Sequence, residues 1–323
     1  MKKQHTFNLI PVLILTLLCS FTIAQDDDDD LGTDKLAQTG MKFLSFSPDA
    51  RAAALGGAIT AKSGGASSLF YNPAGMARVE GMNVSFGQTQ WIADISYISG
   101  GFAYASNAGV LGISFMSVNY GDLQGTIRSS AESGYADNGM FSPTATAVGL
   151  GYAFAPTDRF SVGLHVKIAS EDLGVATVDA DGGTKKLDMS TPAYDFGLMY
   201  QMDWKNLMLA MSARNFSQSL KYAEEPFELP LTFRMGVSAD VANNLSVSLV
   251  NERPRDYFTT YRVGLEYSVM EMMDIRAGYV TPSDEAGINL GVGFKMAGFG
   301  VDVSYTDFGV FDSVMRFGLN YTL

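Results

Sequence analysis

The sequence predicts an all-β fold: a transmembrane antiparallel β-barrel of about 14 strands with a short N-terminal helical plug. Three observations lead to this prediction. The chain begins with an apolar segment of the kind that directs export. After residue 81, apolar and polar side chains alternate in one segment after another. The connections between these segments are alternately short and long, which is typical of outer-membrane barrels.

Residues 1–24 are predicted to be a signal peptide. Two lysines form a basic start, an apolar core runs from Leu9 to Cys19, and Ala24 is a small residue at the cleavage position. The alternative, an N-terminal membrane anchor, is disfavoured because the apolar stretch is too short to span a bilayer. We therefore expect the signal to be cleaved and the mature chain to reside in the cell outer membrane.

Cleavage leaves a mature chain without cysteine, because Cys19 is the single one in the sequence. Disulfides and cysteine-based catalysis or metal sites are therefore excluded in the mature protein. The formal net charge changes from −12 to −14, because the signal carries two lysines. This charge argues against a nucleic-acid partner, since binding to phosphates needs a basic surface.

Residues 25–42 form a predicted acidic, disordered leader. It contains five consecutive aspartates, Asp26 to Asp30, and such runs are usually solvated. A calcium site there would lack the spaced ligands and the glycine of the known calcium-binding loop. We expect neither a metal site nor a cofactor in this protein.

Residues 43–81 do not alternate and are predicted to form a plug inside the barrel. Ser47 is a candidate N-cap before Pro48, which favours a helix over residues 50–55. A second helical turn is expected over residues 66–71. The many alanines and glycines would let the backbone pack closely against an inner wall. The alternative is a periplasmic tail that plugs nothing.

The predicted plug contains a candidate motif formed by Asn72, Pro73, Ala74 and Gly75. Pro73 fixes its own φ angle and restricts Asn72 to extended conformations, while Gly75 permits a close turn. We expect this motif to lie within the barrel or across its periplasmic mouth.

Residues 82–323 are predicted to form the barrel. In residues 160–169, every second side chain from Phe160 to Ile168 is apolar, and those between are small or polar. One such strand fits either a soluble sandwich or a barrel whose apolar face meets lipid. Fourteen segments of this kind are expected, at residues 82–90, 94–105, 109–120, 143–154, 160–170, 192–202, 207–216, 231–240, 245–253, 260–268, 274–280, 286–297, 299–307 and 313–323.

Loop length distinguishes the two folds. The connections after even-numbered strands are short turns, such as residues 106–108 and 156–159. The three longest connections, residues 121–142, 171–191 and 217–230, all follow odd-numbered strands. Outer-membrane barrels place short turns on the periplasmic side and longer loops outside, whereas a soluble sandwich has no reason to sort its loops in this way. The sequence therefore favours the membrane barrel.

Ten charged side chains at inward strand positions are the candidate lumen residues. Seven are basic and three are acidic, although the protein as a whole is acidic. Two interpretations are open: the charges pair with one another along the wall, or surplus arginines attract a carboxylate or the acidic terminus of another protein. The candidates are Lys167, Asp195, Arg214, Arg234, Arg262, Glu266, Arg276, Lys295, Asp302 and Arg316.

We identify no candidate catalytic residue in the sequence. His165 is the one histidine outside the signal peptide, so a Ser-His-Asp triad would have to use it. Its place in an alternating strand favours a lumen-facing or hydrogen-bonded histidine over a general base. No acid pair or metal cluster stands at a useful spacing. We therefore expect a protein that is not an enzyme.

Part of the predicted plug resembles a known family. Residues 43–61 contain the run Ala-Arg-Ala-Ala-Ala-Leu-Gly-Gly, and residues 66–77 contain Tyr-Asn-Pro-Ala-Gly. Both runs resemble the start of PorV/PorQ-family proteins, which belong to the FadL-type superfamily of fourteen-stranded barrels. Ser63-Gly64-Gly65 replaces an acidic pair that many relatives carry. Beyond residue 77 the resemblance is one of architecture.

The resemblance implies functions of different classes. A PorV-like protein would be a type IX secretion component, a non-enzymatic barrel that engages the C-terminal signal domains of exported clients. A FadL-like protein would transport hydrophobic small molecules across the outer membrane, and a third possibility is a structural barrel without a substrate. The predicted polar lumen and long outer loops favour the secretion component.

The expected partners follow from these alternatives. They are outer-membrane lipid, together with secretion-system proteins and their clients or with a hydrophobic ligand. Tyr222 and Phe227, in the third long loop, are candidate client contacts, because large apolar groups are costly to expose without a partner.

Overall fold

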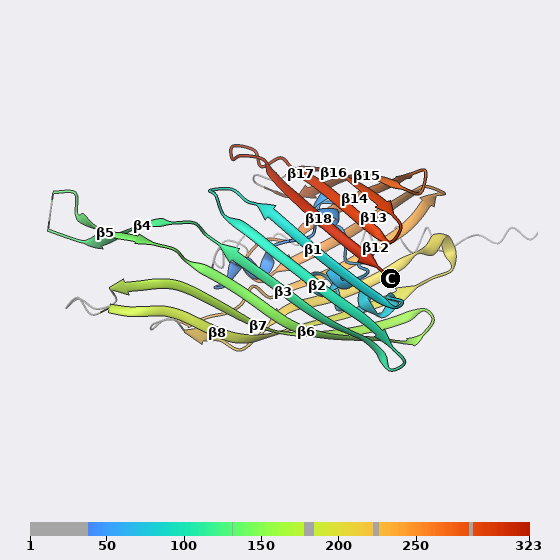
Figure 1. The fold of residues 1–323 in the computed structure, drawn as a ribbon, viewed down its shortest axis with the longest axis horizontal. Helices are drawn as coiled ribbons and strands as arrows, with labels where there is room; N and C mark the ends of the chain where they lie inside the picture. The colour runs from blue at the N-terminus through green and yellow to red at the C-terminus, as the bar shows by residue number, and fades with distance from the viewer. Residues whose placement is uncertain (1–37, 131, 178–183, 222–225, 284–286) are drawn as a thin grey trace, which may run out of the picture.

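Fourteen antiparallel strands close into a barrel in the computed structural model, which describes residues 38–130, 132–177, 184–221, 226–283 and 287–323 (Figure 1). Each barrel strand pairs with the barrel strands before and after it in the chain, and the first and last strands close the ring, with Asn83 opposite Thr322. The predicted fold is confirmed. The predicted signal peptide and residues 25–37 of the predicted leader lie outside the described residues.

Each of the fourteen barrel strands overlaps one of the predicted segments. They are β1 (Met82–Gln90), β2 (Ser96–Ser106), β3 (Gly109–Asn119), β6 (Thr144–Thr157), β7 (Phe160–Thr177), β8 (Thr184–Gln201), β9 (Met208–Phe216), β12 (Thr232–Ala242), β13 (Leu245–Pro254), β14 (Thr260–Val269), β15 (Met273–Thr281), β16 (Ile288–Met296), β17 (Phe299–Thr306) and β18 (Val314–Thr322).

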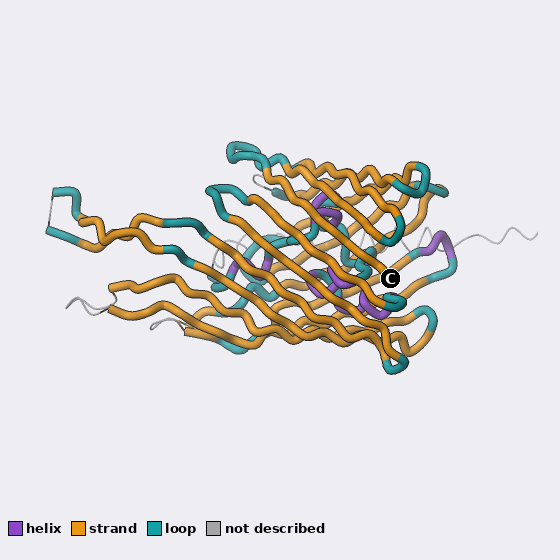
Figure 2. Tube along the Cα trace, in the orientation of Figure 1, coloured by secondary structure: helices purple, strands orange, loops and turns teal. Residues whose placement is uncertain are grey.

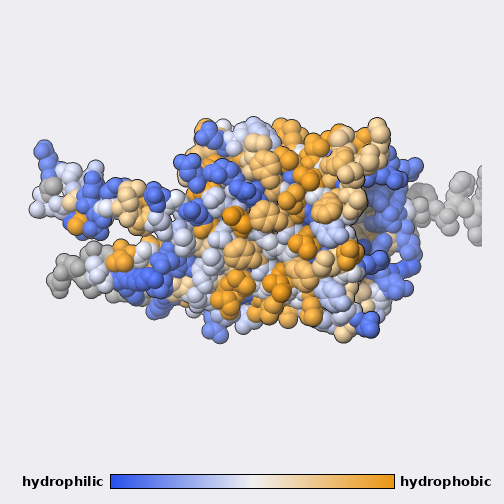
Figure 3. All heavy atoms as spheres, viewed as in Figure 1, coloured by the Kyte–Doolittle hydropathy of each residue, from blue (hydrophilic) through white to orange (hydrophobic). Residues whose placement is uncertain are grey.

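The outward face of the barrel is apolar. In β3, Leu111, Ile113 and Phe115 are exposed, whereas Ser114 and Met116, on the other face, are buried. On the face that Figure 3 shows, hydrophobic residues are concentrated in a band across the middle of the barrel, between two hydrophilic ends. Such a band matches the hydrocarbon layer of a membrane.

The three long connections all leave the same end of the barrel, here called the outer end (left in Figure 1). The first contains β4 (Leu123–Arg128) and β5 (Tyr135–Phe141), which pair only with each other among the described residues. The third contains β10 (Leu220–Lys221) and β11 (Pro226–Phe227).

The second long connection differs from the prediction. Strands were expected to end at residue 170 and to resume at residue 192, yet β7 and β8 each run for 18 residues. Their pairing continues outward to Thr177 and Thr184. The apolar alternation stops where the hairpin leaves the membrane, because both faces then meet water, but backbone pairing does not depend on that alternation.

Short helices fill the barrel interior (purple in Figure 2). They are η2 (Lys42–Ser45), α2 (Ala50–Ala54), η3 (Ala66–Phe70) and η4 (Pro73–Arg78), while η5 (Trp204–Asn206) lies in a turn between strands. α2 contacts β15 to β18, η3 contacts β1 to β3, and η4 contacts β6 to β8. The plug therefore touches the wall on several sides. None of the described helices is long and apolar enough to cross a membrane.

The described part of the plug starts before residue 43. Thr39 bridges to Glu228, Lys42 forms an ion pair with Asp256 at 2.6 Å, and Met41 is buried. Residues 38–42, assigned to the leader from their sequence, therefore belong to the plug. Their contacts are with connections at the outer end, whereas Gly81 lies beside Leu323 at the opposite end. The plug thus runs along the whole lumen.

A closed barrel makes a testable prediction about denaturation. Because every strand edge of the ring is paired, the barrel should resist dodecyl sulfate at room temperature and unfold only on boiling. We expect boiled and unboiled samples to migrate at different positions on a gel, and the protein to fractionate with outer membranes. Identical migration of the two samples would contradict a closed barrel.

Candidate functional site

The plug motif is anchored by Asn72, whose side chain is buried. Its amide donates to the carbonyl of Thr60 at 3.1 Å and to that of Leu198, on β8, at 3.3 Å. Its Oδ1 accepts from the backbone N–H of Ala74 at 3.2 Å and so caps η4. Asn72 therefore joins two parts of the plug to the barrel wall.

Glycines make room for this motif. A Cβ atom at Gly197 would lie 2.0 Å from Asn72 Oδ1, and one at Gly163 would lie 2.3 Å from the carbonyl carbon of Pro73. A Cβ at Gly75 would lie 2.7 Å from Ser63 O. At these distances a larger residue would force the plug away from the wall, because packed interiors have no spare volume.

The cap of α2 differs from the prediction. Asp49, rather than Ser47, is the N-cap, and its Oδ1 accepts from the N–H of Ala52 at 2.8 Å. Ser47 hydrogen-bonds instead to the hydroxyl of Tyr71 at 2.8 Å. Both residue types favour capping, and the contact that decides between them comes from a distant part of the chain. Burial raises the pKa of Asp49, and the hydrogen bond from Ala52 opposes that shift.

The ten candidate lumen charges all lie on the inward face of their strands. Arg262 is half-buried, Lys295 is exposed, and the other eight are buried. Most of them are in ion pairs with one another or with residues that the sequence analysis did not select.

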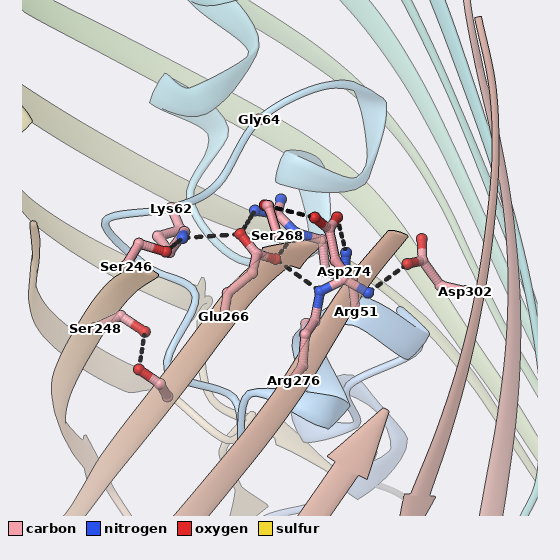
Figure 4. A network of polar contacts seen from close by, with 12 residues as sticks. Arg51, Lys62, Gly64, Ser246, Ser248, Glu266, Ser268, Asp274, Arg276 and Asp302 are labelled. Carbon is pink, nitrogen blue, oxygen red and sulfur yellow. Dashed lines mark hydrogen bonds and ion pairs between the residues drawn. The ribbon is translucent and has the colours of Figure 1, made fainter. Parts of the chain in front are cut away.

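Glu266, on β14, is the centre of the largest network (Figure 4). It accepts hydrogen bonds from Arg51 at 2.9 Å and Lys62 at 2.9 Å, both in the plug, and from Arg276 on β15 at 2.6 Å. Arg276 also pairs with Asp302 at 2.6 Å. Burial lowers the pKa of Lys62, and the Glu266 carboxylate opposes this shift. One wall carboxylate therefore holds two cations of the plug.

Two acids that pair with candidate lumen charges were missed by the sequence analysis. Glu252 pairs with Arg234 at 2.5 Å and with Arg262 at 2.9 Å. Asp274 pairs with Arg276 at 2.7 Å and with Lys295 at 2.6 Å. The sequence contained the information needed to find Asp274, because the two-residue period of a strand places it on the same face as Arg276. With these acids, the basic excess of the lumen is smaller than the sequence suggested.

A Ser-His-Asp hydrogen-bond chain lies in the wall beneath the plug. Ser114 Oγ is 2.8 Å from His165 Nε2, and His165 Nδ1 is 2.9 Å from Asp195 Oδ2. Lys167 also donates to Asp195, at 2.7 Å. All these side chains are buried, and the void beside them measures about 10 Å³, the space of roughly one water molecule. This series of hydrogen bonds has the connectivity of a catalytic triad, but the void beside it leaves no room for a substrate.

Asp195 stabilises the backbone where the pairing between β8 and β9 is interrupted. The β8–β9 pairing shifts register between Tyr194 and Phe196, and the backbone N–H of Asn215 donates to Asp195 Oδ1 at 2.7 Å. The carboxylate thus satisfies a donor that the interrupted ladder leaves without a carbonyl.

A pocket of about 450 Å³ opens above the plug at the outer end of the barrel. Its floor is formed by plug residues, including Phe46 and Gly57. Its sides carry aromatic residues from three connections at the outer end, namely Trp91, Tyr257 and Phe308. Among the lining residues, four are basic and one, Glu252, is acidic; the basic ones are Lys42, Arg234, Arg262 and Arg316.

The two candidate client contacts are placed differently. Tyr222 lies outside the described residues. Phe227 is half-buried, and its ring lies over Gly40, where a Cβ would be 2.3 Å from the ring. Part of the Phe227 ring therefore contacts the plug rather than solvent.

The Glu266 network predicts how firmly the plug is held. Glu266→Gln would remove the carboxylate that pairs with Arg51 and Lys62 of the plug, while Arg276 would keep Asp274 and Asp302. Breaking a buried ion pair costs about 3–5 kcal/mol. We expect the temperature at which the compact gel form disappears to fall by on the order of 10 °C. Single-channel conductance should rise as the plug loosens. Glu228→Gln, which removes a half-exposed partner of Arg255, is the control and should change neither quantity. Equal behaviour of the two variants would contradict the role of Glu266.

Several solved structures share this fold. The monoaromatic hydrocarbon channel CymD has a TM-score of 0.61 and 12% identity, over 88% of this chain and 99% of that chain. The toluene transporter TodX of Pseudomonas putida has a TM-score of 0.59 and 13% identity, over 84% and 96%. A FadL homologue of Pseudomonas aeruginosa has a TM-score of 0.54 and 13% identity, over 85% and 98%. At these identities the likeness shows the fold alone.

The family is shown by sequence. No curated protein matches the chain. The family model for "Type IX secretion system protein PorV", however, matches residues 30–244, which is more than half of the chain and includes the plug and the strands from β1 to β12. Together with the closed barrel and its apolar outer band, this match confirms the resemblance seen in the plug and places the protein in the outer membrane. The chain belongs to the PorV family of type IX secretion proteins.

Proposed function

We propose that the protein works in type IX secretion by binding exported client proteins at the outer end of its barrel. The observation that carries the proposal is the family match over residues 30–244, a range that contains all three long outer connections. The expected partners are secretion-system proteins and their clients, and no catalytic step is needed for this role.

The β4–β5 hairpin is the most suitable binding surface. It stands beyond the barrel in Figure 1 and carries apolar side chains that meet solvent, with Tyr135 54% and Met140 62% exposed. Each of its two strands pairs on one side only among the described residues, so each leaves a row of backbone donors and acceptors open. A partner could add a strand to this edge and cover the apolar side chains in one step.

The filled lumen supports a binding role over a conducting one. Plug contacts reach β1 to β3, β6 to β8 and β15 to β18 of the wall, so a polypeptide would have to displace the plug to pass through the barrel. Client proteins would therefore meet the outer surface. Tyr222 and Phe227 remain candidate contacts, with Phe227 offering only the part of its ring that Gly40 does not cover.

A second candidate function is transport of a hydrophobic small molecule. The fold is shared with hydrocarbon channels, and the outer pocket has the size of a small-molecule site. The buried ion-pair networks of the wall would have to separate along any path inward, and this cost favours the secretion role.

Deleting the gene separates the two functions. If the protein binds clients, proteins with C-terminal secretion domains should accumulate in the periplasm, while uptake of long-chain fatty acids stays normal. Immunoblots of periplasm and medium, together with uptake of a labelled fatty acid, measure both outcomes. Normal secretion with impaired uptake would favour the transporter instead.

Substitutions in the hairpin test the proposed surface. Tyr135→Ser with Met140→Ser should reduce secretion severalfold, because it removes the apolar contacts but leaves the barrel unchanged. Thr126→Ser with Asn138→Ser is the matched control in the same hairpin and should secrete normally. Both variants should keep the gel behaviour of a closed barrel. Equal secretion by the two variants would show that clients bind elsewhere.

A further inference from the structure

Arg316, on β18, is a buried cation that has no carboxylate partner among the described residues. Arg316 is 5% exposed, and within the described part of the chain its guanidinium makes one hydrogen bond, from Nη1 to Thr306 Oγ1 at 2.9 Å. Its buried Nε has no hydrogen-bond partner in that part of the chain. No described carboxylate forms an ion pair with it, in contrast to Arg234 and Arg276 on the same inner wall. A guanidinium has five N–H donors, so most of those of Arg316 have no partner among the residues that the structure describes.

Arg214 is the other buried arginine of the lumen without a carboxylate among the described residues. Its Nη2 donates to the carbonyl of Leu44 at 3.1 Å, and the adjoining void measures about 10 Å³. That space is too small for more than a water molecule. Arg316, by contrast, lines the outer pocket of about 450 Å³. The two arginines therefore differ in whether an added anion could reach them.

Aromatic rings surround Arg316. Its Cζ lies 5.4 Å from the ring centroids of both Phe46 and Trp91. The Phe46 ring stacks on Tyr97 with centroids 3.7 Å apart, and Trp91 meets Phe308 edge-on at 4.9 Å. Cation–π contacts offset part of the cost of burying the charge, but they satisfy none of its N–H donors.

The residues that line the pocket indicate which ligand would accept hydrogen bonds from the Arg316 guanidinium. A carboxylate can accept two parallel hydrogen bonds from one guanidinium. The single lining acid, Glu252, is already shared by Arg234 and Arg262. An added carboxylate at Arg316 would therefore meet a basic surface without a competing free acid among the lining residues. The aromatic residues beside it offer apolar contact to whatever carries the carboxylate.

We propose that the outer pocket binds a carboxylate attached to an aromatic or branched apolar group. The carboxylate pairs with Arg316, and the apolar group lies against Trp91 and Phe308. Two sources share this chemistry: a free aromatic acid from outside the cell, or the C-terminal residue of a peptide. The second source rests on the proposed function, whereas the first does not.

The two tryptophans of the chain provide a direct assay. Trp91 lines the pocket, and Trp204 lies in the turn between β8 and β9 at the opposite end. In a Trp204→Phe background, Trp91 is the single reporter. The full mature protein in detergent is titrated with 3-phenylpropionate and with N-acetyl-alanyl-phenylalanine. The corresponding amides, 3-phenylpropionamide and N-acetyl-alanyl-phenylalaninamide, are the neutral controls.

We expect at least one acid to change Trp91 fluorescence saturably, and its amide to bind at least about tenfold more weakly, because charge-assisted hydrogen bonds are lost. Arg316→Gln should weaken binding of that acid by a similar factor. Arg255→Gln, which removes a positive charge at the same end outside the pocket lining, should bind as the parent does. Phe308→Ala, in an outer connection, should weaken binding without affecting the barrel.

The outcomes separate the sources. Binding of the free acid alone assigns the site to small molecules, and binding of the peptide acid alone assigns it to a C-terminus. Binding of both supports the shared chemistry. The proposal is overturned if neither acid binds, if the amides bind as well as the acids, or if Arg316→Gln and Phe308→Ala both keep the gel behaviour of a closed barrel and the parent affinity. The hairpin secretion test can fail without affecting any of these results.

Discussion

The lumen of this barrel is filled by its own N-terminal segment, and that contact shapes the inner wall. Where α2 and the residues after it meet the wall, a Cβ at Gly278 would lie 2.1 Å from Gly56 N, and one at Gly291 would lie 2.4 Å from Ala54 Cβ. In a water-filled barrel these wall positions could carry polar side chains. Here glycine is required, because the backbone of the plug at Gly278 and the Ala54 side chain at Gly291 leave no room for a Cβ atom.

The same contact determines where charges can lie. A charge that faces the plug loses water and needs a partner. Glu266 provides one for Arg51 and Lys62 of the plug, and Arg276 connects this network to Asp302 on β17. Plug and wall therefore form one electrostatic unit, and the loss of Glu266 would leave Arg51 and Lys62 of the plug without the carboxylate that pairs with them. A plug tied in this way resists displacement.

The sequence was sufficient to predict the barrel, its membrane-spanning strand segments and the ends at which long and short connections lie, because local alternation marks each segment and so the length of each connection. It did not predict that β7 and β8 extend beyond the alternating part. It was not sufficient for contacts between distant residues. Asp49 caps α2, while the Ser47 hydroxyl is hydrogen-bonded to Tyr71, which lies 24 residues further along the chain. Glu266 meets Arg51 from a position 215 residues away. Periodicity tells which face a side chain occupies, but not which side chain of the plug it will meet.

The outer end of the barrel is built differently from the rest, and this difference bears on function. A strand needs about 9–11 residues to cross a bilayer, yet β7 and β8 have 18 each. Their outer parts, like the β4–β5 hairpin, are paired strands rather than loose loops, so less conformational entropy is lost when a partner binds. A channel gains nothing from such rigid extensions, because a solute needs only an open path. A protein that must hold another protein at the membrane surface gains a preformed surface with open strand edges. Because the plug fills the lumen, the extended outer end is the part of the barrel that offers a surface to a partner. This favours the role of a secretion partner over that of a pore.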